Sequence, residues 1–163
     1  MTALIAVTYP SFDSARSTAD HLRASQTVAG ITLLDLVIAE RRDNEKIKLH
    51  QSEHPSAQGA LGGGLLGLLV GVIFAAPAFG FLGGAAIGAA SGLLADHGIP
   101  DDWMQNLAEQ VAHGRATLFV LLADEPTDKA MELFGQDGAV LYTSLDYEDE
   151  ERLRRSMRAT LGA

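Results

Sequence analysis

Apolar and polar residues follow different periods along this chain, and the periods predict a mixture of strands and helices. A continuous apolar run at residues 4–7 and the mostly apolar residues 117–122 are typical of buried strands. Apolar residues at steps of three and four, over residues 12–22 and 103–111, predict two amphipathic helices. Ser11 or Asp13 is placed to cap the first of these helices.

Turn signals separate the remaining elements. Residues 31–39 are apolar and rich in β-branched side chains, residues 46–49 alternate between charged and apolar, and the polar residues 41–44 lie between them, which predicts a β-hairpin. Polar residues 124–127 predict the start of a short helix that runs through Phe134. A short strand at residues 139–142 and an amphipathic helix at residues 147–161 are predicted to follow.

The middle of the chain differs from both flanks in composition. Residues 57–95 contain 11 of the 17 glycines and no charged residue. Leucine, valine, isoleucine, phenylalanine and alanine fill most of the other positions, whereas flexible linkers are rich in glycine and serine and are solvated. We therefore interpret this segment as an apolar insert and not as a linker.

Eight glycines of the insert recur every four residues, in two runs separated by a break around Pro77. They are Gly59, Gly63, Gly67, Gly71, Gly80, Gly84, Gly88 and Gly92. A step of four residues places each glycine nearly above the last on one helix face, where another helix can approach closely. The pattern predicts a glycine-zipper helical hairpin. Its predicted apolar outer face consists of Leu65, Leu68, Leu69, Val72, Ile73, Phe79 and Leu82.

Each half of this hairpin would span about 25 Å at about 1.5 Å per residue, slightly less than a bilayer core of about 30 Å. Because both ends of a hairpin emerge on one side, the two flanks can fold together. We expect residues 1–56 and 97–163 to form one discontinuous ferredoxin-like α+β domain, and residues 57–96 to form the hairpin. In this prediction a βαββ half precedes the insert, an αβ half follows it, and an αβα extension ends the chain.

This segment order, with the doubled glycine run at its centre, resembles the bacterial DUF1269 family of uncharacterised predicted membrane proteins. The likeness extends over nearly the whole chain, and the glycine run is its most specific part. The resemblance implies membrane association or assembly, and it implies no catalytic residue.

Charge and cysteine content exclude several classes of function. Twelve Lys and Arg against 21 Asp and Glu give a net charge of -9, which disfavours nucleic acid as a partner. The absence of cysteine excludes a disulfide partner, a thiolate zinc site and a cysteine nucleophile. The first nine residues do not have the pattern of a signal peptide.

Two motifs resemble known sites but lack the required context. His50, Glu53 and His54 match H-x-x-E-H, yet they follow a predicted strand and precede Pro55, so we expect no metal site. Glycines 62, 64 and 67 match G-x-G-x-x-G without a preceding strand or a following acidic residue, so we expect no nucleotide cofactor.

Two single residues have alternative interpretations. Asp35 lies in an apolar run, where alternation places it on a face with Leu33 and Val37. It is either an edge-strand or surface carboxylate, which we favour, or a buried one with a partner, where a raised pKa would make it a candidate site residue. The register of the strand could also shift there at a β-bulge. Trp103 is either an anchor at a membrane surface or part of the core with Leu107 and Val111. The sequence pattern supports the core interpretation at least as strongly.

The sequence favours a non-enzymatic, membrane-associated structural protein that forms homo-oligomers through its glycine-zipper hairpin. The nearby basic residues 41, 42, 46 and 48 favour the inner membrane with the charged domain in the cytoplasm. The first alternative is a soluble cytoplasmic homo-oligomer or filament whose hairpins form a shared core, because the second helix is mostly glycine and alanine. The second alternative is a small-ligand sensor or enzyme built on the ferredoxin-like domain.

Overall fold

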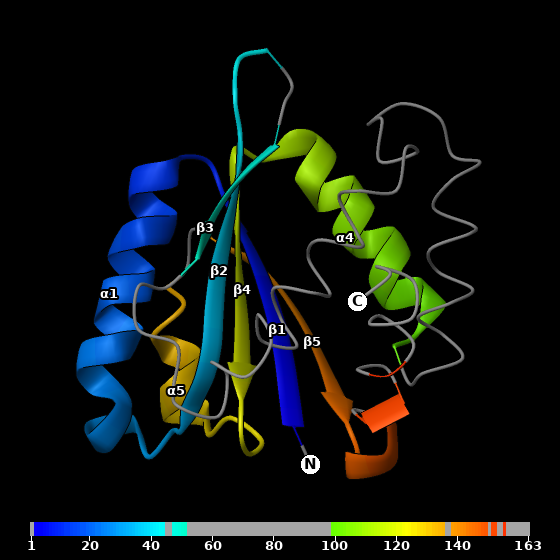
Figure 1. The fold of residues 1–163 in the computed structure, drawn as a ribbon. Helices are drawn as coiled ribbons and strands as arrows, with labels where there is room; N and C mark the ends of the chain where they lie inside the picture. The colour runs from blue at the N-terminus through cyan, green and yellow to red at the C-terminus, as the bar shows by residue number, and fades with distance from the viewer. Residues whose placement is uncertain are drawn as a thin grey trace.

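A computed structural model describes residues 2–44, 47–51, 99–135, 138–149, 151–152 and 155. These residues form an α+β fold in which helices cover both faces of a five-stranded antiparallel sheet (Figure 1). The elements in chain order are β1 (Thr2–Tyr9), α1 (Phe12–Ala29), β2 (Leu33–Arg41), β3 (Ile47–Gln51), α4 (Asp101–His113), β4 (Ala116–Leu122), α5 (Asp128–Glu132) and β5 (Ala139–Leu145). The α+β class and this order of elements agree with the sequence prediction.

The strand order is β3-β2-β4-β1-β5, and each strand is antiparallel to its neighbours. The predicted hairpin of β2 and β3 is confirmed, with Ala39 opposite Leu49. β4 comes after the glycine-rich segment, yet it lies between β2 and β1. Strands from both flanks therefore share one sheet.

The two central strands are buried along their whole length. All eight residues of β1 and all seven of β4 are buried. Because both faces of these strands are covered, their sequences are mostly apolar and do not alternate, and the buried hydroxyls of Thr8 and Thr117 bond to each other at 3.0 Å. This is the physical reason why these two strands could be predicted from the sequence.

Each face of the sheet packs against a different helix. On one face, Ala15, Ala19 and Leu22 of α1 join Ile5 and Val7 of β1 in the main core cluster. α4 lies on the opposite face, next to β1 and β5 (Figure 1). Trp103, Leu107 and Val111 of α4 are buried, which confirms the interpretation of this stripe as core.

The helix ends follow from local sequence. Ser11, one of the two predicted capping residues, caps α1 by accepting a hydrogen bond from the Ser14 N–H at 3.1 Å. Gly30 ends α1 with a left-handed φ of 65°. Thr127 caps α5 in the same way, through the Ala130 N–H at 3.2 Å. Gly114 ends α4 where a Cβ atom would overlap the Thr8 side chain, so glycine is needed there for close approach.

Some predictions fall on other parts of the chain. The glycine-zipper hairpin at 57–96 lies outside the described residues, and so does most of the helix predicted at 147–161. Residues 147–149 and 151–152 are helical, with an Arg152–Glu148 ion pair at 3.2 Å. Among the helices described within residues 2–155, none has the length and apolar character needed to cross a membrane.

Candidate functional site

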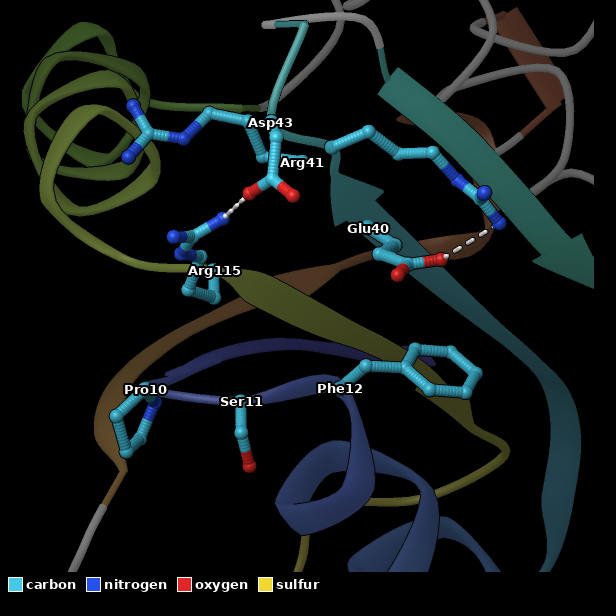
Figure 2. Close-up of a pocket in the computed structure, with 8 residues that line it drawn as sticks. Pro10, Ser11, Phe12, Glu40, Arg41, Asp43 and Arg115 are labelled. Atoms are coloured by element: carbon cyan, nitrogen blue, oxygen red, sulfur yellow. Dashed lines mark hydrogen bonds and ion pairs between the residues drawn. The ribbon is translucent and has the colours of Figure 1, made fainter.

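A polar pocket of about 340 Å³ lies where β1 and β2 end and β4 begins (Figure 2). It is lined by Pro10, Ser11, Phe12, Glu40, Arg41, Arg42, Asp43 and Arg115. Figure 2 shows Arg115 and Asp43 facing each other, with Pro10, Ser11 and Phe12 along the opposite side. Three separate parts of the chain thus contribute to one pocket.

Main-chain hydrogen bonds hold these parts together. The Arg115 N–H donates to the Tyr9 carbonyl at 3.1 Å, and the Arg41 N–H donates to the Arg115 carbonyl at 2.8 Å. The backbone of Arg115 is therefore fixed between the ends of β1 and β2. Its side chain is left to interact within the pocket.

Guanidinium groups give the pocket its charge. Arg115 Nη1 donates to Asp43 Oδ1 at 2.6 Å, with side chains that are 54% and 93% exposed. Arg42 Nη2 lies 3.4 Å from Glu40 Oε2. The hydrogen bond and the positive charge of Arg115 lower the pKa of Asp43. Three arginines against two carboxylates leave the lining with a net positive charge, in a chain whose net charge is -9.

A second set of contacts holds Glu40 at one side of the pocket. His50 Nε2 of β3 lies 2.8 Å from Glu40 Oε2, across the strand pair. The His50 ring packs against Phe12, with 4.5 Å between ring centroids. His50 is the first residue of the H-x-x-E-H sequence, whose Glu53 and His54 lie outside the described residues. Within the described ranges, no cluster of three or more His, Asp or Glu side chains is placed to hold a metal ion.

Asp35 is half-buried in β2, next to an irregularity in the strand pairing. The register between β2 and β4 shifts between Leu33 and Asp35, which is the bulge considered from the sequence. Its Oδ1 accepts a hydrogen bond from the Leu36 N–H at 2.8 Å. Burial raises the pKa of the Asp35 carboxyl, and this hydrogen bond partly opposes the rise. Asp35 therefore lies between the two interpretations, since it is neither fully exposed nor fully buried.

Another hollow, of about 490 Å³, lies between α1 and α5. It is lined by Ser17, Thr18, His21, Lys129, Glu132, Leu133 and Gly135. Its lining has one lysine and one carboxylate and contains no guanidinium group. The lining of the pocket at Arg115 therefore contains more positively charged side chains.

The site residues predicted from the sequence, eight zipper glycines and seven outer-face residues, all lie outside the described residues, so those predictions stay predictions. The pocket at Arg115 was not predicted. Its sequence signal was the basic pair Arg41-Arg42 in the predicted turn. Arg115 lies more than 70 positions later, so its proximity depends on the strand order.

The described residues define an α+β protein with a five-stranded antiparallel sheet, and the glycine-rich segment joins β3 to α4 in the sequence. The chain belongs to the DUF1269 family, described as a protein of unknown function, whose match covers residues 60–158. This is more than half of the chain, although less than the nearly complete coverage expected. No match was found among curated proteins or among solved structures.

Proposed function

We propose that this protein is a non-enzymatic, membrane-associated, self-associating structural protein. Its glycine-rich segment, residues 57–96, would form a helical hairpin that inserts into a membrane and packs against other copies. The observation that carries the proposal is the run of 39 residues, 57–95, without a charged side chain. A water-exposed hairpin of this composition would present an apolar patch far larger than a few hundred Å², so it needs lipid or protein neighbours.

The sheet order supports a single folded domain beside this hairpin. Because β4 lies between β2 and β1, the flanks cannot form separate sheets. We infer a ferredoxin-like unit made of β1, α1, β2, β4, α5 and β5, with α1 and α5 on one face. This assignment differs from the sequence-based one, which gave β3 and α4 to that unit. β3, the glycine-rich segment and α4 would then form one insertion between β2 and β4.

A soluble homo-oligomer or filament is the second candidate. The second glycine run, residues 80–92, is mostly glycine and alanine, and helices with small side chains pack better against protein than against lipid. In this alternative the hairpins of several copies would bury one another.

Membrane fractionation separates the two candidates. The untagged full-length protein is expressed, membranes are washed with alkaline carbonate, and the fractions are sized with and without detergent. Membrane insertion predicts a carbonate-resistant pellet that only detergent releases. A large particle in the cytosolic fraction, unchanged by detergent, would refute insertion and support the soluble assembly.

Glycine substitutions test the zipper itself. Gly84→Leu should reduce oligomer size, because its side chain would block close approach between helices. Gly83→Leu is the matched control, since this substitution adds the same side-chain volume one position away from the four-residue period. Equal effects of the two substitutions on oligomer size, measured by light scattering in detergent, would contradict the zipper.

A further inference from the structure

The pocket at Arg115 concentrates guanidinium groups that solvent can reach. The chain contains 12 lysines and arginines, and three of them line this one hollow. The side chains of Arg42 and Arg115 are 48% and 54% exposed, so a ligand can approach both. Guanidinium presents its N–H groups as a planar fork that matches the oxygens of phosphate and carboxylate.

The partners that now hold these arginines are easily displaced. Asp43 is almost fully exposed and contacts Arg115 from a turn, and Glu40 lies at the long distance of 3.4 Å from Arg42. The Arg115–Asp43 pair is exposed on both sides, and exposed ion pairs contribute little to stability. Glu40 also contacts His50, so it keeps one polar partner if the Arg42 side chain rotates to bind a ligand. An anion with two negative charges can therefore compete with a single carboxylate.

The opposite side of the pocket adds further suitable groups. Ser11 and Phe12 stand at the N-terminus of the 18-residue helix α1, whose dipole favours negative charge there. Pro10 and Phe12 add an apolar wall. A volume of about 340 Å³ exceeds that of a phosphate ion and leaves room for a small organic group attached to it.

We propose that this pocket binds the phosphate group of a small phosphomonoester or of a lipid headgroup, through Arg115 and Arg42, with Asp43 as the carboxylate that the ligand displaces. Asp43 then acts as an internal competitor. Removing it should strengthen binding, whereas removing Arg115 should weaken it. The inference does not depend on the glycine-rich hairpin.

Isothermal titration of the full-length protein in mild detergent, at fixed ionic strength, tests this site with inorganic phosphate and glycerol 3-phosphate as probes. Arg115→Gln should raise the Kd at least about tenfold, the scale expected for losing a charged hydrogen-bond donor. Asp43→Asn should lower the Kd about twofold to fivefold, since a competing exposed ion pair is worth at most about that factor. Both residues are exposed, so neither change should disturb folding.

The exposed pair Arg23–Asp20 of α1 provides matched controls. Its atoms lie 2.9 Å apart, but neither residue lines the pocket. Arg23→Gln and Asp20→Asn make the same changes of charge and should leave the Kd within about twofold, as expected for screened surface charges. Wild-type affinity in Arg115→Gln, or an equal loss in Arg23→Gln, would overturn the proposal. So would the absence of measurable binding of either probe to the wild-type protein.

A third probe distinguishes the two sources of phosphate. Dihexanoyl phosphatidic acid carries the headgroup phosphate on a soluble lipid. If it binds at least about tenfold more tightly than glycerol 3-phosphate, and Arg115→Gln removes this binding, the ligand is a lipid headgroup. If the two probes bind alike and both require Arg115, the ligand is a soluble phosphomonoester.

Discussion

Tyr9→Phe is the most informative single substitution in the described fold. The Tyr9 hydroxyl donates a hydrogen bond to the Phe134 carbonyl at 2.7 Å, and Tyr9 is only 3% exposed. This bond connects the end of β1 to the turn after α5, 125 positions later in the chain. The substitution removes the donor and leaves a carbonyl without this partner in a buried environment.

The expected loss follows from this geometry. A buried hydrogen bond contributes about 0.5 to 1.5 kcal/mol net, and an unpaired buried group costs about 1 to 3 kcal/mol. We expect Tyr9→Phe to lower the free energy of unfolding by about 1 to 3 kcal/mol at pH 7. Denaturant titration of the full-length protein in detergent measures it, with the fluorescence of the single, buried Trp103 as the probe.

Alkaline pH provides a second test of the same bond. Burial raises the pKa of Tyr9, while a hydrogen bond with the Thr18 side chain acts in the opposite direction. Above about pH 10 the unfolded tyrosine loses its proton before the folded one does, so the wild-type protein loses stability as the pH rises. Phenylalanine cannot titrate, so the difference between wild type and Tyr9→Phe should shrink there.

Tyr147→Phe is the control, because Tyr147 is 76% exposed and its loss should change stability by less than about 0.5 kcal/mol. A Tyr9→Phe protein as stable as the control at pH 7 would refute the role of the bond. If the difference in unfolding free energy between wild type and Tyr9→Phe stays constant up to pH 11, burial does not raise the pKa of Tyr9 as argued.

Two further predictions concern stability. Gly138→Ala should destabilise the fold by about 1 to 3 kcal/mol, because a Cβ atom would overlap Val7 and crowd the Tyr9 ring; a wild-type denaturation midpoint would contradict this. Asp35→Asn should be more stable than wild type at neutral pH, because the raised pKa of the folded carboxyl makes wild-type stability fall as the pH rises above about 4. The gain should vanish below about pH 4, and thermal unfolding at pH 3 and pH 7 checks the sign.

The sequence predicted the elements well because local patterns decide them. β1 and β4 each contain a continuous apolar run, and Ser11, Gly30 and Gly114 mark helix ends by their own chemistry. β5 is longer than the predicted strand at 139–142, since its last residues pair with β1 in a way that the sequence pattern does not indicate.

Pairing between distant segments could not be predicted in the same way. The apolar sequence of β4 does not indicate that this strand lies between β2 and β1, because any fully buried strand has a similar composition. The pocket depends on that position, since the order of the sheet brings Arg115 next to Asp43. The half-buried position of Asp35 could not be predicted for a related reason: the register shift between Leu33 and Asp35 arises from pairing with the distant strand β4.

The central position of β4 constrains the order of events during biosynthesis. Between the end of β3 and the end of β4 the ribosome must add 71 residues, from Gln51 to Leu122, which takes roughly 4 to 14 s at about 5 to 20 residues per second. Throughout that interval β1 and β2 lack the strand that separates them, and their apolar faces remain open to wrong partners. The nascent chain is therefore expected to need protection by a chaperone until β4 has been made.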